Sequence, residues 1–153
     1  MSVNQQSPLT TWVEVPENSD FSIYNLPYGI FSYNDKKPRV GVAIGDYVID
    51  MASLYKRGYL DVLFLNENIF KSPTLNRFIG LGKPYWTQTR KRLLELLDRN
   101  NMTLQLKKDD VAAILIPMTK VQMHLPLHIG NYTDFYSSQE HATNVGRMFR
   151  PNV

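Results

Sequence analysis

The sequence has 153 residues, of which 43% are hydrophobic, and a formal net charge of +3. A chain of this length can bury roughly 70% of the surface that its unfolded form exposes, which is enough for one hydrophobic core. The basic residues are not gathered on one face, which argues against a nucleic-acid partner. The absence of cysteine excludes disulfides, thiolate catalysis and sulfur-ligated zinc.

Three short strands are expected in the first half of the chain. Residues 29–33, 40–44 and 47–51 are rich in aromatic and β-branched side chains, and residues 34–38 have the composition of a turn. Gly45 and Asp46 leave the two-residue spacing of a tight hairpin between the second and third strands. Short strands joined by tight turns indicate a small barrel or a strongly bent sheet.

The middle of the chain is expected to be helical. A first helical segment opens at residues 73–76 and is stopped by Gly80-Leu81-Gly82. A second begins at Pro84, where the missing N–H costs nothing, and ends near Asn100. Its apolar period predicts a face packed on the core, formed by Tyr85, Thr89, Leu93, Leu96 and Leu97. Residues 109–118 are predicted to form a short helical turn followed by a buried strand.

No apolar run in the sequence reaches the ~20 residues of a membrane-spanning helix. Residues 1–20 also lack the apolar run of a signal peptide. We therefore expect a cytoplasmic protein without a membrane partner.

Chemistry-bearing residues concentrate near the C-terminus. All three histidines, His124, His128 and His141, fall in the last thirty residues. The same stretch carries a mixture of side chains typical of a polar site: Tyr132, Asp134, Tyr136, Ser137, Ser138, Glu140, Asn144 and Arg150. Each also has a structural explanation, since an Asp can cap a turn and an Arg can be a surface charge. The spacing alone therefore specifies no reaction.

Other site types fit these residues poorly. His124 and His128 are four residues apart, but Pro126 between them disfavours the helix that would bring both onto one zinc ion. No segment matches a P-loop, a dinucleotide-binding fingerprint or a Gly-x-Ser-x-Gly elbow.

Several segments together resemble one known family. Residues 124–126 read HLP, residues 129–138 read IGNYTDFYSS and residues 141–146 read HATNVG. Earlier in the chain, in the same order as in that family, residues 20–32, 38–50 and 73–82 read DFSIYNLPYGIFS, PRVGVAIGDYVID and PTLNRFIGLG. The sequence is similar over nearly its whole length to the N-terminal portion of the fumarylacetoacetases.

This resemblance implies a fold that is mainly β with some α. An SH3-like small barrel is expected over residues 1–117. Residues 118–153 are expected to be the truncated start of a mixed β-sandwich or roll catalytic domain. The resemblance also implies a cytoplasmic homodimer.

The implied activity is hydrolysis of 4-fumarylacetoacetate to fumarate and acetoacetate, the last step of tyrosine and phenylalanine degradation. The implied cofactor is a divalent metal, Ca²⁺ and/or Mg²⁺. By position in the motif, Asp134 resembles the metal ligand, Tyr136 and Arg150 resemble substrate-binding residues, and His141 resembles the general base. These types suit the roles: hard cations prefer carboxylate oxygen, Arg matches a carboxylate, and His is the commonest general base.

Two departures from the family pattern qualify these expectations. Asn131 stands where many members have Asp, and the family's other metal ligands lie beyond Val153. We therefore expect this chain alone to bind divalent metal weakly and not to turn over substrate. The alternative hypothesis is a non-catalytic barrel module with a structural or partner-binding role.

Overall fold

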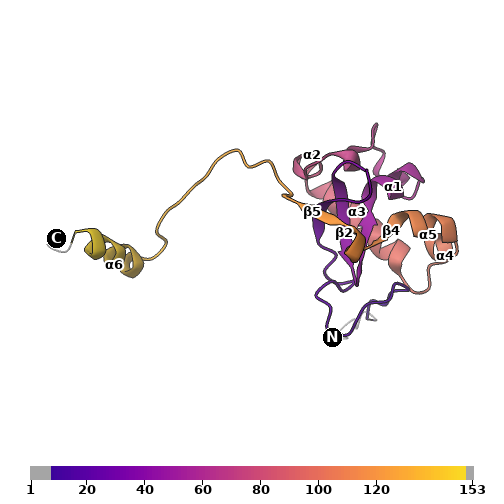
Figure 1. Ribbon diagram of the computed structural model, residues 1–153, viewed down its shortest axis with the longest axis horizontal. Helices are drawn as coiled ribbons and strands as arrows, with labels where there is room; N and C mark the ends of the chain where they lie inside the picture. Colours follow the sequence, from indigo (N-terminus) through magenta and orange to yellow (C-terminus); the bar gives the residue numbers. More distant parts are fainter. Residues whose placement is uncertain (1–7, 151–153) are drawn as a thin grey trace, which may run out of the picture.

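A curled antiparallel sheet with helices packed around it forms the body of the protein (Figure 1). The structure is a computed structural model that describes residues 8–150. Residues 1–7 and 151–153, the outer ends of the two expected domains, lie outside the described residues. The strands are β1 (Tyr28–Ser32), β2 (Arg39–Ile44), β3 (Tyr47–Asp50), β4 (Leu115–Pro117) and β5 (Gln122–His124).

Six α-helices and three short 3₁₀ turns make up the rest of the regular structure between residues 8 and 150. The helices are α1 (Met51–Lys56), α2 (Asn76–Gly80), α3 (Lys83–Leu97), α4 (Met102–Gln105), α5 (Lys108–Ile114) and α6 (Gln139–Phe149). The 3₁₀ turns are η1 (Asp61–Leu63), η2 (Ile69–Lys71) and η3 (Met118–Lys120). No helix in this described range is long and apolar enough to cross a membrane.

The predicted hairpin at Gly45 and Asp46 is confirmed. β2 and β3 pair antiparallel, with Ala43 opposite Val48 and Ile44 opposite Tyr47. Gly45 has a positive φ of 52°, which glycine adopts without a steric penalty. The turn is also anchored from outside, because Gly45 N donates to Phe21 O at 2.8 Å.

Chain connectivity forces the sheet to curl. The strand order is β4-β3-β2-β1-β5, so β4 and β5 lie at opposite edges although they are neighbours in sequence. In a flat sheet those edges would be roughly 19 Å apart, at about 4.8 Å per strand spacing. The connection between them contains η3 and reaches no more than roughly 13 Å, because a 3₁₀ turn rises only about 2 Å per residue. The sheet is therefore a half-barrel, which confirms the predicted SH3-like fold with some α.

The main hydrophobic core lies between one face of the sheet and the helices. The amphipathic face predicted for the second helical segment is confirmed at Thr89, Leu93, Leu96 and Leu97 of α3, which are buried. Tyr85, the fifth residue of the predicted face, is only half-buried. Fully buried residues of the sheet, including Ile30, Val42 and Ile49, belong to the same core. A smaller cluster is formed by Phe31, Tyr33, Val48 and Ile116.

A buried carboxylate joins this sheet to the first helix. Asp50 has no solvent exposure. Its side chain caps α1 by accepting from Ser53 N at 2.9 Å, and it also accepts from Ser53 Oγ at 2.9 Å. The Tyr33 hydroxyl donates to Asp50 at 3.1 Å, and Arg39 Nη1 lies 3.8 Å from the same carboxylate. Asp50, the last residue of β3, therefore connects β2, α1 and the residue that follows β1 through one group.

A second polar contact attaches α5 to the segment after α1. The Tyr59 hydroxyl donates to Asp110, which also pairs with Arg57. Burial and the bond to Asp110 raise the pKa of Tyr59 to about 12. The bond from Tyr59, helped by Arg57, lowers the pKa of Asp110.

We expect this contact to make stability fall at alkaline pH. A group whose pKa is raised on folding contributes its full stabilisation at pH values below its pKa in the unfolded state. That stabilisation is lost as the pH rises through the pKa of the group in the folded state. For Tyr59 the window runs from pH 10 to about 12. Urea unfolding at several pH values should show that the free energy of unfolding declines less in this window for Tyr59→Phe than for wild type. Burial also raises the pKa of Tyr28 to about 12, so Tyr28→Phe should remove a further part of the alkaline decline in the free energy of unfolding. Identical declines in wild type and both variants would contradict this assignment.

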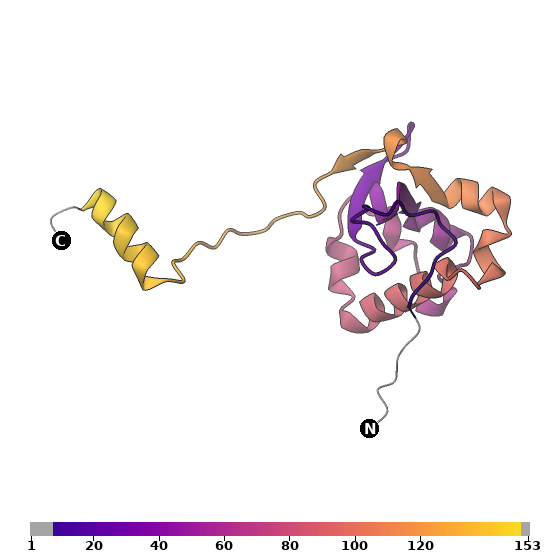
Figure 2. The ribbon, with the colours of Figure 1, turned by 90° about the horizontal axis from the view of Figure 1, so that it is seen from below.

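The sheet continues past residue 117, the end expected for the first domain. β5 pairs with β1, with Ile30 opposite His124 and Ser32 opposite Gln122. Beyond β5 the chain continues as an extended segment that leads to α6, which lies apart from the sheet in both views (Figures 1 and 2).

Candidate functional site

The four residues predicted for the site lie on the extended segment and on α6. Asp134 and Tyr136 precede the helix, His141 is in its first turn, and Arg150 follows its last residue. All four are exposed. The half-barrel itself contributes none of them.

The cap of α6 fixes where His141 lies. Ser138 is the N-cap residue, and its Oγ accepts from His141 N at 3.3 Å. The same hydroxyl donates to Glu140 Oε2 at 2.8 Å, which lowers the pKa of Glu140. An N-cap of this kind satisfies one of the free N–H groups at the helix start. The sequence Ser-Gln-Glu-His therefore starts a helix and puts the imidazole in its first turn.

The structure brings two of the predicted residues together. The rings of Tyr136 and His141 are 5.4 Å apart between centroids, with an angle of 59° between their planes. Such tilted arrangements are favourable for aromatic pairs. A phenol and an imidazole thus face the same region of solvent at the start of α6.

The other two predicted residues are not joined to this pair by a hydrogen bond or an ion pair in the described part of the chain. Arg150 is separated from His141 by nine helical positions, which is about 13 Å along the axis. Within residues 8–150, the side chains of Asp134 and Arg150 make no hydrogen bond or ion pair. The structure therefore assembles a Tyr–His pair, to which neither the Asp134 carboxylate nor the Arg150 guanidinium is bonded.

The three histidines do not gather. His124 Nε2 lies 2.8 Å from Ser32 Oγ at the edge of the sheet, and His128 is held through its backbone by Asn76. Within the described range, no group of three or more His, Asp or Glu side chains could hold a metal ion. A Ca²⁺ site usually takes 6–8 oxygen ligands. The described residues therefore do not form a metal site, and the assignment of Asp134 as a ligand stays a prediction.

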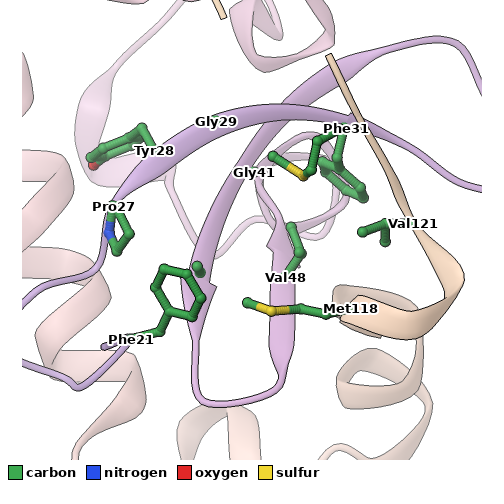
Figure 3. A pocket seen from close by; sticks show the side chains of 11 residues that line it. Phe21, Pro27, Tyr28, Gly29, Phe31, Gly41, Val48, Met118 and Val121 are labelled. Atoms are coloured by element: carbon green, nitrogen blue, oxygen red, sulfur yellow. The ribbon is translucent and has the colours of Figure 1, made fainter. Parts of the chain in front are cut away.

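A second candidate site is an apolar groove on the half-barrel (Figure 3). It has a volume of about 330 Å³ and lies between the sheet and the β4–β5 connection. No acidic or basic side chain lines it, so it offers no general base for hydrolysis. Its lining residues are Phe21, Pro27, Tyr28, Gly29, Phe31, Gly41, Ala43, Val48, Met118, Val121 and Met123. Sequence reasoning missed this groove, although Gly29 and Gly41 in successive strands were a signal for it.

Gly41 is needed for the packing beside this groove. A Cβ at this position would lie 2.5 Å from Val48 Cγ1 and 2.7 Å from Phe31 Cδ1, well inside contact distance. We expect Gly41→Ala to lower the free energy of unfolding by about 1–3 kcal/mol because of this overpacking. Gly80→Ala is the matched control, since a Cβ there meets nothing within 4 Å. Urea unfolding should show a loss for Gly41→Ala and none for Gly80→Ala; equal stability of the two variants would contradict the packing.

The structure defines the class of protein as an SH3-like half-barrel domain followed by an exposed polar segment. Comparison with known proteins is consistent with this class. The family model described as fumarylacetoacetase N-terminal matches residues 24–126. The chain belongs to the fumarylacetoacetase family, a family of hydrolases, and corresponds to its N-terminal portion.

Individual relatives extend the match into the site segment. The chain is 45% identical to the fumarylacetoacetase of Homo sapiens over 141 residues, which are 92% of this chain and 34% of that protein. It is 43% identical to the protein of the same name from Caenorhabditis elegans and 44% identical to that from Dictyostelium discoideum. These matches cover 93% and 94% of this chain. The chain spans about a third of the length of these curated relatives.

Proposed function

We propose that this chain forms the N-terminal barrel and the first site segment of a fumarylacetoacetase, which hydrolyses 4-fumarylacetoacetate to fumarate and acetoacetate. The observation that carries the proposal is the 45% identity to a protein named fumarylacetoacetase over 92% of this chain. An alignment of that extent reaches beyond the barrel into the segment with Asp134, Tyr136 and His141.

The proposed reaction needs a base, an anion-binding group and a hydrogen-bond donor. Water adds its oxygen to the fumaroyl carbonyl, the carbon–carbon bond breaks, and the acetoacetate carbon receives a proton. We assign proton removal from that water to His141, since a positioned imidazole contributes about 10²–10⁴ in rate. Arg150 pairs with a substrate carboxylate through its planar fork, and Tyr136 donates a hydrogen bond beside His141.

The cofactor and the assembly are part of the same proposal. Asp134 is one candidate ligand for Ca²⁺ or Mg²⁺, and the other oxygen ligands would have to come from elsewhere. A cytoplasmic homodimer acting on a small molecule, without nucleic-acid or membrane partners, completes the proposal. Because the described residues do not make a metal site alone, we expect the isolated chain to bind these cations weakly.

The experiment compares this chain with the longest reading frame that contains it. Both are purified and incubated with 4-fumarylacetoacetate, and loss of its ultraviolet absorbance is followed. We expect turnover by the longer protein and none by the 153-residue chain. No turnover by either protein would contradict the proposal.

A second candidate function is a non-catalytic role of the barrel. The observation that favours it is the apolar groove of about 330 Å³, which carries no acid or base. The same experiment separates the two candidates, because a structural module gives no hydrolysis in either form of the protein.

A further inference from the structure

Hydrogen bonds beyond the sheet hold the chain where it leaves the half-barrel. β5 ends at His124, but residues 126–128 are still attached to the start of α2. Leu75 N donates to Pro126 O at 2.8 Å. Asn76 Nδ2 donates to His128 O at 3.0 Å, and His128 N donates to Asn76 Oδ1 at 2.9 Å.

An asparagine side chain suits this contact for a chemical reason. A carboxamide carries a donor and an acceptor side by side, as a peptide group does. Asn76 therefore pairs with both backbone groups of His128, much as a neighbouring strand would. Leu75 contributes an N–H that has no partner inside a helix that begins at the next residue. An Asn at a helix start is usually interpreted as a local cap, whereas this one binds a residue 52 positions away.

His128 is the last point at which the described chain is attached to the half-barrel. Within residues 129–150, every hydrogen bond found is internal to that segment. The large apolar side chains there are exposed, including Ile129, Tyr132 and Phe135. The contact at Asn76 thus sets the position from which the site segment starts.

We propose that Asn76 is a positioning residue, which through its paired bonds to His128 determines where the segment with Asp134, Tyr136 and His141 leaves the half-barrel. The effect of Asn76 on catalysis rests on the proposed function, whereas its hydrogen bonds to His128 do not depend on that function. Without the bonds to Asn76 the chain is next held at Pro126 by Leu75 N, so the free tether to Asp134 lengthens from about six to about eight residues. The r.m.s. span of a flexible tether grows with the square root of its length, so it rises about 1.2-fold.

Amide exchange on the purified chain tests the hold directly. We expect the His128 N–H to exchange about tenfold faster in Asn76→Ala, which loses both bonds. Asn76→Asp keeps an acceptor for His128 N and lacks the donor, so it should give an intermediate rate. The control is Asn66→Ala, an exposed asparagine for which residues 8–150 show no side-chain hydrogen bond, and it should leave the rate unchanged.

Distance measurements test the positioning. The sequence has no cysteine, so Lys71→Cys and Ser137→Cys place one spin label on the body and one on the tail. The free tether to residue 137 lengthens from about nine to about eleven residues, so we expect the distance distribution to broaden about 1.1-fold when Asn76→Ala is added. The urea midpoint of the barrel should stay at its wild-type value. Unchanged His128 exchange, or faster exchange across the whole sheet with a lower midpoint, would overturn the proposal.

The last readout is catalytic. In the longest reading frame, Asn76→Ala should lower kcat about tenfold with little change in KM, because a misplaced base slows the chemical step. An unchanged kcat would overturn the positioning role. If the wild-type longer protein hydrolyses nothing, the proposed function fails, and His128 exchange still decides whether Asn76 holds the tail.

Discussion

Asp50→Ala should destabilise the half-barrel by about 4 kcal/mol, a large part of the 5–15 kcal/mol typical of a folded domain. The substitution removes the cap of α1, which is worth about 1 kcal/mol. It also leaves the buried Tyr33 hydroxyl and the half-buried Ser53 Oγ without their acceptor, and bonds to a charged group contribute about 1.5–3 kcal/mol each. Urea unfolding gives the free-energy difference.

Two further variants separate the causes of this loss. Asp50→Asn keeps an oxygen that can cap α1 but removes the charge that faces Arg39, so about half of the loss should remain. Asp35→Ala changes an exposed carboxylate in the β1–β2 turn and should stay within about 0.5 kcal/mol of wild type. An Asp50→Ala protein as stable as Asp35→Ala would show that the buried carboxylate does not stabilise the fold.

His141→Ala has the largest effect expected on activity. In the longest reading frame, the substitution should lower kcat by about 10²–10⁴, the contribution of a positioned general base. Since Ser138 caps α6 through the backbone N–H of His141, the alanine variant keeps that bond and the helix start. The loss would therefore report the imidazole rather than unfolding of α6.

His128→Ala is the matched control for this prediction. His128 is also exposed on the tail, and its hydrogen bonds to Asn76 use only backbone atoms. We expect its kcat to stay within about twofold of wild type. A fall of less than tenfold for His141→Ala, or equal falls for the two variants, would remove His141 from the role of base.

Local chemistry made the β2–β3 hairpin and α3 predictable. Gly45 and Asp46 fix the turn, and the buried positions of α3 repeat at helical spacing. β5 could not be predicted, because Gln122, Met123 and His124 carry no strand pattern and pair only because β1 offers a free edge. α1 was missed because six residues give too little periodicity, and its cap, Asp50, is held by tertiary contacts.

The candidate site also has a part that could be predicted from the sequence and a part that could not. Asp134, Tyr136, His141 and Arg150 were found through a family motif, because their spacing alone fits several kinds of site. The contact of Asn76 with His128 was missed because it joins residues far apart in the sequence. A local pattern cannot identify the distant backbone that a side-chain amide will bind.

Product analysis is the most direct test of the central claim that this chain is part of a fumarylacetoacetase. The longest reading frame is incubated with 4-fumarylacetoacetate, and fumarate and acetoacetate are quantified over time. The expected result is that both products appear in equal amounts as substrate disappears, and that the 153-residue chain forms neither. Absence of both products from the longer protein would contradict it, and the family membership would then describe ancestry and fold without the activity.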